Sequence, residues 1–204
     1  MAKDNIVDLF PTGLVMCRYT EDYSKELEFI KKQPIQKSPR TYNKQSTDTF
    51  ILDRPELKNI RAFIELKAQN YLEEVLGSDR QLVITQSWIN VNSQREIHRE
   101  HRHPNSLISG VWYPQVSRTS PPIAFQSNEY YMDIEFKRLT QYNCNAHLIP
   151  VEKGHLLLFP SKILHSVPEN QSYEDRISLS FNTWIKGDLG EKEKLTYLPL
   201  DRCV

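Results

Sequence analysis

The hydrophobic pattern of this 204-residue chain changes character near position 80. Before that position, one run repeats apolar residues at steps of three and four, which is the spacing of a single helix face. The members of this stripe are Leu57, Ile60, Ile64, Ala68, Tyr71 and Val75. Asp53 as N-cap, Pro55 in the first turn and Gly77 beyond the end predict one long amphipathic helix that packs on a sheet.

The elements expected before that helix are short. Residues 6–16 predict an opening strand broken by a Pro/Gly turn, and Thr20 or Asp22 can cap a short helix after it. Residues 37–46 are polar and predict a loop, while residues 50–52 predict a short strand. This part of the chain is therefore interpreted as scaffold.

From Gln81 onward the pattern consists of β-branched and aromatic runs separated by turn residues, which predicts strands. The expected strands are Leu82–Ile89, Ile108–Tyr113, Ile123–Phe125, His155–Phe159 and Ile177–Trp184. Few helix signals lie between them, which favours an antiparallel sandwich or jelly roll over a parallel α/β sheet. Residues 129–145 form a polar, tyrosine-rich insertion that is interpreted as a loop.

Length and composition fit one domain. A hydrophobic share of 39% and a charged share of 25% are ordinary for a soluble globular protein. We expect residues 1–204 to form a single domain, with an N-terminal scaffold over 1–80, a β core over 81–186 and a C-terminal tail over 187–204.

Charge and cysteine content argue against several classes of protein. Twenty-six basic residues balance 26 acidic ones, so no net charge attracts the chain to nucleic acid or to membranes. No apolar run is long enough to span a bilayer, and residues 1–5 lack the apolar core of a signal peptide. Cys17, Cys144 and Cys203 are far apart and lack zinc-type spacing, which favours reduced thiols in a cytoplasm.

Histidines gather in one short segment. The run from His98 to His103 holds three of the six histidines of the chain. Residues i and i+2 of an extended strand point to the same side, so His101 and His103 could bind one metal ion together. His165, at the end of a second strand-like segment, offers a third imidazole. The hypothesis is an iron site.

A polar pair follows 11 residues after His165 (176 − 165 = 11). Arg176 and Ser178 alternate with apolar neighbours, so they share one face of the last strand. An antiparallel return would bring the guanidinium of Arg176 beside the metal. A fixed guanidinium fork is suited to binding a carboxylate through two hydrogen bonds, which indicates a small dicarboxylic acid as a partner of the metal.

This set of residues resembles the Fe(II)/2-oxoglutarate-dependent oxygenases, and most closely those of phages and marine bacteria. The resemblance rests on motifs in order along nearly the whole chain. They are Leu9-Phe10-Pro11-Thr12, Trp88-Ile89-Asn90, His101-Arg102-His103-Pro104-Asn105-Ser106, Ser109-Gly110-Val111-Trp112-Tyr113, Leu157-Leu158-Phe159-Pro160-Ser161, Arg176-Ile177-Ser178-Leu179-Ser180-Phe181-Asn182 and Leu195-Thr196-Tyr197-Leu198. The resemblance implies a mainly β fold with flanking helices, a double-stranded β-helix of the jelly-roll, cupin-like type, with iron at the mouth of the barrel.

The resemblance also implies roles for single residues. His101 and His165 would be iron ligands, and His103 would take the position where many relatives have an aspartate. The cofactor 2-oxoglutarate would be held at its far carboxylate by Arg176 and Ser178. Further expected cofactor contacts are Tyr113 and Asn90.

The second metal ligand leaves an alternative open. The segment His98-Arg99-Glu100 would restore the usual carboxylate ligand. In a regular strand, however, His98 and Glu100 point away from the side used by His101 and His103. The Pro-Asn-Ser that follows His103 favours the later pair by resemblance.

The expected activity is hydroxylation of an unidentified substrate by Fe(II), 2-oxoglutarate and O2, with release of succinate and CO2. The alternatives are a three-histidine cupin-type dioxygenase without 2-oxoglutarate and a non-catalytic metal-binding jelly-roll module. Arg95, Arg99 and Arg102 would rim such a site and favour an acidic or phosphate-bearing substrate. We expect a location in the cytoplasm of a bacterial or phage-infected cell, and a homo-oligomer is left open.

Overall fold

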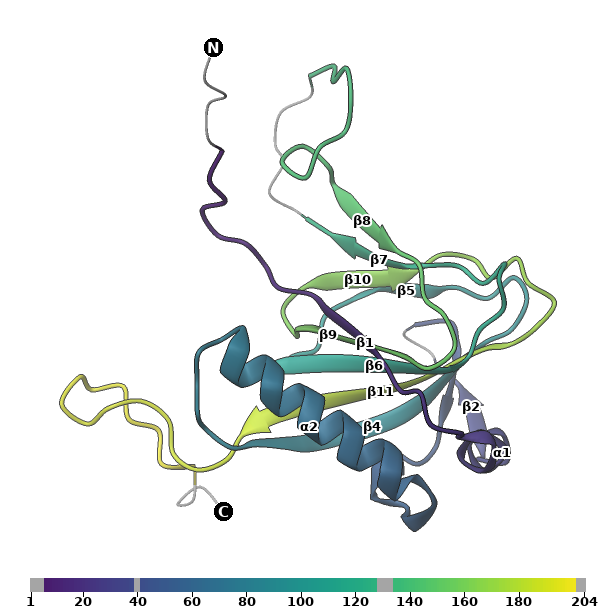
Figure 1. Cartoon of the computed structure of the whole chain (residues 1–204), viewed down its shortest axis with the longest axis horizontal. Coiled ribbons are helices and arrows are strands. Elements are labelled where there is room, and N and C mark those ends of the chain that lie inside the picture. Colours follow the sequence, from purple (N-terminus) through teal and green to yellow (C-terminus); the bar gives the residue numbers. More distant parts are fainter. Residues whose placement is uncertain (1–5, 39–40, 128–133, 201–204) are drawn as a thin grey trace.

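The computed structural model describes residues 6–38, 41–127 and 134–200, and its named strands form two antiparallel sheets (Figure 1). The large sheet has the order β1-β9-β6-β11-β4-β3-β2 and the small sheet the order β5-β10-β7-β8. The strands are β1 Val15–Arg18, β2 Ile35–Lys37, β3 Lys44–Ser46, β4 Leu82–Asn92, β5 His98–His101, β6 Ile108–Gln115, β7 Ile123–Gln126, β8 Ala146–Ile149, β9 His155–Pro160, β10 Leu164–Val167 and β11 Arg176–Ile185. The fold is mainly β with flanking helices, as expected, and has the jelly-roll form.

Two apolar clusters hold these layers together. Between the sheets, Val111 and Phe159 of the large sheet pack with Ile123 and Phe125 of the small one. On the opposite face of the large sheet, a larger cluster is covered by the helices α1 (Ser24–Lys31) and α2 (Lys58–Glu74). The large sheet is therefore buried on both faces over its central strands.

The central strand β11 shows how its sequence distinguishes those faces. Ile177, Leu179 and Phe181 are buried in the cluster beneath α2. The alternate residues Arg176 and Ser178 are also buried and lie on the other face, toward the small sheet. Packing on the helix side is tight, because a Cβ on Gly110 would lie 2.2 Å from Phe181. The polar face is the one that carries the candidate site.

The predicted long helix is present with a different start. Two 3₁₀ turns, Ile51–Asp53 and Pro55–Leu57, precede α2, so Asp53 is not its N-cap. The Asp53 carboxylate instead forms an ion pair with Arg61. The stripe is buried from Leu57 to Tyr71, whereas Val75 is 41% exposed and Leu72 is buried instead. The predicted strand over 50–52 was wrong: Phe50 forms a single isolated bridge with Ser87, and Ile51–Asp53 form the first 3₁₀ turn.

The N-terminal strands differ from the expectation. The opening strand β1 spans Val15–Arg18, whereas residues 6–14 form no strand. Segment 37–46, expected as a loop, contributes residues to β2 and β3, which extend the large sheet beyond β4. The five strands predicted after Gln81 are all present, and β4 and β6 continue two or three residues further.

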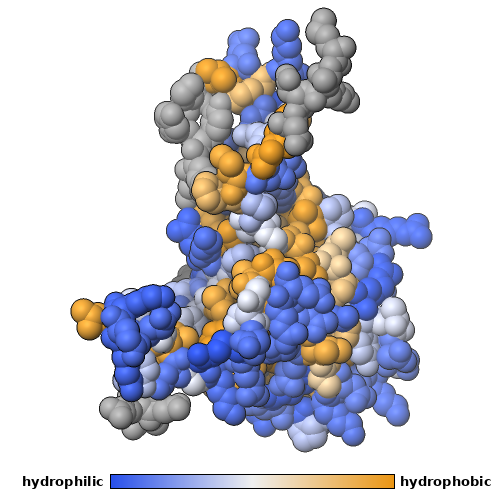
Figure 2. Space-filling model, turned by 60° about the vertical axis from the view of Figure 1, so that its left-hand side comes forward, coloured by the Kyte–Doolittle hydropathy of each residue, from blue (hydrophilic) through white to orange (hydrophobic). Residues whose placement is uncertain are grey.

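One part of the surface is apolar. Figure 2 shows hydrophobic residues gathered on the upper part of one face, above a largely hydrophilic body. Exposed apolar side chains occur in residues 6–10 and in residues 134–148. The two segments are joined by hydrogen bonds from Gln141 and Tyr142 to the Asp8 carboxylate. The expected insertion over 129–145 lies partly outside the described residues, and its described part forms no strand. None of the described helices is long and apolar enough to cross a membrane.

Candidate functional site

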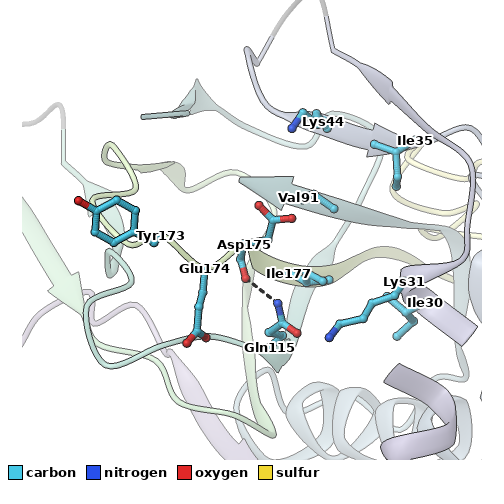
Figure 3. Close-up of a pocket in the computed structure, with 10 residues that line it drawn as sticks. All are labelled: Ile30, Lys31, Ile35, Lys44, Val91, Gln115, Tyr173, Glu174, Asp175 and Ile177. Atoms are coloured by element: carbon cyan, nitrogen blue, oxygen red, sulfur yellow. Dashed lines mark hydrogen bonds between the residues drawn. The ribbon is translucent and has the colours of Figure 1, made fainter. Parts of the chain in front are cut away.

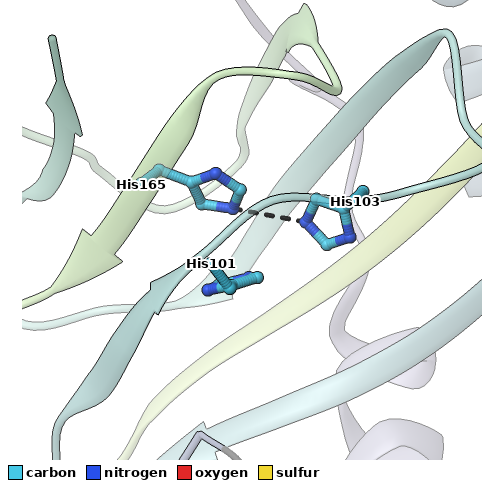
Figure 4. A group of neighbouring side chains, drawn as sticks. All are labelled: His101, His103 and His165. Atoms are coloured by element: carbon cyan, nitrogen blue, oxygen red, sulfur yellow. Dashed lines mark hydrogen bonds between the residues drawn. The ribbon is translucent and has the colours of Figure 1, made fainter. Parts of the chain in front are cut away.

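The structure brings together the three histidines expected as metal ligands (Figure 4). His101 ends β5 and pairs in register with His165 of β10, and His103 follows two residues after His101. One ligand atom from each of the three side chains lies within 4.8 Å of the others. The Nε2 atoms of His103 and His165 are 3.2 Å apart. This is a spacing at which one ion can be bound by three imidazoles.

Backbone carbonyls orient two of these rings. The Nδ1 of His101 lies 2.8 Å from the carbonyl oxygen of Arg99, and the Nδ1 of His165 lies 2.9 Å from that of Ile163. A carbonyl only accepts, so each Nδ1 carries the proton and donates it. The tautomer that results leaves the Nε2 lone pair of each ring free for a metal.

The electrostatic setting keeps the three rings neutral. Burial, together with the neighbouring His165 and His101, lowers the pKa of His103 to about 3. Burial and His101 likewise lower the pKa of His165 to about 3. Burial also lowers the pKa of His101, against the hydrogen bond to Arg99. Metal binding near neutral pH therefore does not have to displace protons from these imidazoles.

The alternative pair His98 and Glu100 is split by an irregularity in β5. His165 pairs with His101, but Val167 pairs with His98, so β5 has one residue more than β10 over this interval. The ring of His98 consequently stacks on that of His101, with centroids 4.4 Å apart and planes at 9°. The expectation that His98 points away was wrong. Glu100 is exposed, accepts a hydrogen bond from Gln126 and is not part of the three-histidine group.

Arg176 and Tyr113 lie on the same polar face with unused hydrogen-bonding atoms. Arg176 is 1% exposed, and its Nε and Nη2 have no partner among the described residues. Its guanidinium carbon is 4.9 Å from the ring centroid of Tyr113, whose hydroxyl is also buried and unpaired. Burial lowers the pKa of Arg176 and raises that of Tyr113, and the close approach of the guanidinium to the phenol opposes both shifts. Within the described residues no Asp or Glu side chain is buried, so the guanidinium has no buried counter-ion.

Two asparagines of β4 on this face differ in their contacts. Asn90, expected as a cofactor contact, is already satisfied: its Oδ1 accepts from Asn43 (3.0 Å) and Gln45 (3.3 Å), and its Nδ2 donates to Ser180 (2.9 Å). Asn92 is fully buried, and neither polar atom of its side chain has a partner among the described residues.

Asn92 also stands nearer the expected anchor. It lies directly opposite Arg176 in the β4–β11 register, and Asn90 lies opposite Ser178. The buried polar atoms of this face that lack a hydrogen-bond partner therefore lie on Arg176 and on its neighbours Asn92 and Tyr113.

A groove opens beside His103. It has a volume of about 570 Å³ and extends from the metal-ligand candidate across β4 to the β2–β3 hairpin. Its wall consists of Gln36, Gln45, Ser46, Thr49, Thr85, Gln86, Trp88, His103, Pro104, Asn105 and Asn182. Sequence reasoning did not find this groove, because its wall joins segments up to about 150 residues apart (182 − 36 = 146).

A second cavity lies on the other face of the large sheet (Figure 3). It has a volume of about 560 Å³, and its wall includes Ile30 of α1 and Ile177 of β11. Lys31 and Lys44 line it together with Glu174 and Asp175. It contains none of the expected metal or cofactor residues, and Ile177 faces the helix side of the sheet.

Comparisons with known proteins agree with this geometry. Residues 86–182 match a family described as "Putative 2OG-Fe(II) oxygenase". This match contains all three histidines of the group, together with Tyr113 and Arg176. Residues 86–182 are therefore similar to the 2OG-Fe(II) oxygenases, over 97 of the 204 residues. No curated protein matches the chain.

Solved structures show the same fold. A 2OG-Fe(II) oxygenase family oxidoreductase from Burkholderia pseudomallei has a TM-score of 0.62 and 11% identity, over 84% of this chain and 85% of that one. A prolyl-4-hydroxylase from Pseudomonas putida has a TM-score of 0.57 and 11% identity, over 85% and 92%. The epimerase SnoN in complex with Fe3+, alpha ketoglutarate and nogalamycin RO has a TM-score of 0.61 and 14% identity, over 84% and 78%. The finer likeness to oxygenases of phages and marine bacteria stays a prediction.

Fe(II) and 2-oxoglutarate are the metal and the cofactor that the matched family's description names. The residues present fit both groups. Three neutral imidazoles suit a ferrous ion, and the buried guanidinium with unused Nε and Nη2 suits an incoming carboxylate. The protein is an oxidoreductase by family, while the matched folds include both a hydroxylase and an epimerase.

Proposed function

We propose that this oxidoreductase is a hydroxylase, which oxidises a C–H bond of its substrate to an alcohol. In the balanced reaction, one oxygen atom of O2 enters the new hydroxyl group and the other enters succinate, while 2-oxoglutarate loses CO2. Bound Fe(II) and 2-oxoglutarate supply this oxidation chemistry. The observation that supports the proposal best is a fully buried guanidinium with two unused nitrogens on the face of the large sheet that is turned toward the small sheet, whose strands carry His101 and His165.

Different residues of the chain would bind the iron and orient its ligands. His101, His103 and His165 would hold the iron through neutral imidazoles, and the carbonyls of Arg99 and Ile163 keep two of those rings oriented. His98 stacks on His101 and limits rotation of that ring. The glutamate alternative is disfavoured, because Glu100 is exposed and bonded to Gln126.

Arg176 would hold the far carboxylate of 2-oxoglutarate through two hydrogen bonds. The Tyr113 hydroxyl and the Asn92 amide are the nearest candidates to complete this anion site, since both are buried without partners. Ser178 lies two residues from Arg176 on the same face and would contribute its hydroxyl. Burial of the anchor excludes water, so each of these hydrogen bonds is stronger than it would be in solvent. Asn90 would hold β3 to β4 instead of touching the cofactor.

One titration tests the proposal. Purified protein is mixed with Fe(II) and 2-oxoglutarate without oxygen, and the visible metal-to-cofactor charge-transfer band is recorded. We expect the band in the wild type, and succinate after oxygen is admitted. A folded, iron-loaded protein without the band would remove 2-oxoglutarate from the mechanism and favour the three-histidine dioxygenase. A folded protein that binds no iron would exclude both enzymes.

Matched variants test the ligand set. His103→Ala should weaken iron binding by at least about a hundredfold, because loss of a mere hydrogen-bond partner of a metal ligand already costs about 10- to 100-fold. Glu100→Ala changes a side chain of the same segment and should leave iron binding unchanged. The opposite pair of results would move the metal to the His98/Glu100 register.

We further propose a location in the cytoplasm of a bacterial or phage-infected cell. The free thiols of Cys17 and Cys144 are compatible with a reducing compartment.

A further inference from the structure

The groove beside His103 is polar and uncharged. Apart from the imidazole of His103, no ionisable side chain lines it among the described residues. Eight members of its wall carry a hydroxyl or a carboxamide: Gln36, Gln45, Ser46, Thr49, Thr85, Gln86, Asn105 and Asn182. Gln45, Ser46 and Asn182 already form hydrogen bonds within the protein, so a ligand would pair mainly with the other five. Hydroxyls and carboxamides both donate and accept hydrogen bonds, so they complement a ligand with groups of the same dual kind. The hydroxyl groups of a sugar are of this kind.

Trp88 gives the groove one aromatic member. Its ring centroid is 5.6 Å from that of His103, so Trp88 adjoins the metal-ligand candidate. Its indole N–H is buried and has no partner among the described residues. A buried donor without an acceptor is costly, which points to an acceptor oxygen supplied by a ligand.

The arginines that suggested an acidic substrate lie elsewhere. Arg95, Arg99 and Arg102 are exposed, and none of them lines the groove. The guanidinium of Arg99 instead stacks on the ring of Tyr42, 3.9 Å from its centroid. A phosphate in the groove would therefore have no cationic partner there.

Peptides and nucleobases fit the groove less well. Grooves that bind extended peptides provide apolar pockets for alternate side chains, but the non-polar members of this wall are limited to Trp88 and Pro104. A flipped nucleobase is held between stacked apolar or aromatic side chains, with basic residues on its phosphates. The composition of this wall matches neither pattern.

We propose that this groove binds an uncharged, polyhydroxylated substrate, a neutral sugar or glycoside, and presents it at the three-histidine site. This inference rests on the proposed function for the reaction, but its binding step does not need the iron. The sugar hydroxyls pair with the carboxamides and hydroxyls of the wall, and one ring oxygen or hydroxyl accepts from the Trp88 indole.

Saturation-transfer NMR on the metal-free full-length protein tests the binding step. The probes are neutral mono- and disaccharides, their methyl glycosides, the corresponding sugar phosphates and uronic acids, and a set of uncharged peptides. We expect transfer to neutral saccharides, with at least about tenfold weaker binding of the phosphorylated or carboxylated member of each pair. Stronger binding of the charged member, transfer to peptides alone, or transfer to no saccharide would overturn the proposal.

Two glutamine variants test whether the saccharide binds in this groove. Gln86→Ala removes one exposed carboxamide from the wall and should weaken saccharide binding about fivefold, the value of one or two hydrogen bonds. Gln81→Ala removes an exposed glutamine just before β4, outside the groove, and should leave binding unchanged. Equal effects of the two variants would overturn the assignment to this groove.

A second readout separates this inference from the proposed function. With Fe(II), 2-oxoglutarate and O2, bound saccharides should increase succinate release and gain one oxygen atom by mass spectrometry. Saccharide binding without a charge-transfer band would contradict the oxygenase reaction and leave the groove assignment intact. A normal band with no saccharide binding would contradict the groove assignment alone.

Discussion

The two faces of the large sheet use the same strands for opposite purposes. Toward α2, Leu179 and Phe181 of β11 are completely buried among apolar neighbours. Toward the small sheet, Arg176 is equally buried, yet its guanidinium and the neighbouring Tyr113 hydroxyl lack partners. The helix side is thus packed without a ligand, whereas buried polar atoms on the inner side need a ligand to form their hydrogen bonds. Stability and binding should therefore respond to different residues of one strand.

The largest effect is expected from Arg176→Leu. Removing the buried guanidinium should weaken 2-oxoglutarate binding about a thousandfold, or ~4 kcal/mol, as for other buried charge pairs that lose one partner. The free energy of unfolding of the cofactor-free protein should stay equal or rise, because an unpaired buried charge is replaced by an apolar side chain. Titration of the charge-transfer band and urea unfolding measure the two quantities. Loss of stability with unchanged affinity would reverse the roles of the two faces.

Leu179→Ala is the complementary change on the helix side. It should lower the free energy of unfolding by ~3 kcal/mol, because it leaves a cavity beneath α2. The affinity of the folded fraction for 2-oxoglutarate should remain that of the wild type. Urea unfolding and the same titration, performed at low temperature, test this. A fall in affinity similar to that of Arg176→Leu would show that the faces are not independent.

Lowering the pH should destabilise the folded protein through the buried histidines of the site. His103 and His165 have folded-state pKa values of about 3, against about 6.5 in an unfolded chain. Between these values the unfolded chain binds more protons, so the stability of metal-free protein falls as the pH drops below about 6.5. Each histidine contributes up to ~1.4 kcal/mol per pH unit.

Chemical unfolding in the presence of a chelator, between pH 4 and pH 8, measures that slope. The double variant His103→Gln/His165→Gln should reduce it, since glutamine does not titrate, while the lowered pKa values of His98 and His101 keep part of the slope. A wild-type slope that persists in the double variant would assign the acid sensitivity to other groups.

The smallest effect is expected from the two asparagines of β4. Asn92→Ala should weaken 2-oxoglutarate binding about fivefold and leave the unfolding free energy nearly unchanged, because its amide is unpaired without ligand. Asn90→Ala should instead cost ~2 kcal/mol of stability, since it leaves Asn43, Gln45 and Ser180 without a partner. Cofactor titration and urea unfolding on both variants give the comparison. The reverse pattern would return Asn90 to the cofactor site.

The sequence predicts well where pattern and burial coincide. Five of the eight strands after Gln81, together with the helix stripe, were found from their runs of apolar residues, whereas the four-residue strands β5, β8 and β10 were not among the expected strands. Strands β2 and β3 were missed because they are three residues long and contain mostly lysine, glutamine and serine. Exposed apolar residues such as Leu9 and Phe10 placed the first strand too early.

The residues of the candidate site were also only partly predictable from the sequence. His101 and His103 could be grouped from their spacing, and the structure adds His165 through the pairing of β5 with β10. The antiparallel return expected between His165 and Arg176 was wrong, because β10 and β11 lie in different sheets. The position of His98 could not be predicted, since it depends on one additional residue in β5 that no local signal marks. The difference between Asn90 and Asn92 depends on Asn43 and Gln45, which reach Asn90 across more than 40 residues of chain.

The buried arginine has a further consequence for the lifetime of the protein. A folded state with an unpaired guanidinium in its interior is stabilised when a dicarboxylate binds there. The free energy of unfolding then increases with the logarithm of the ligand concentration. Molecules that lack the ligand open more often and are the first to meet proteases. Resistance of the purified protein to proteolysis should therefore rise with the concentration of 2-oxoglutarate.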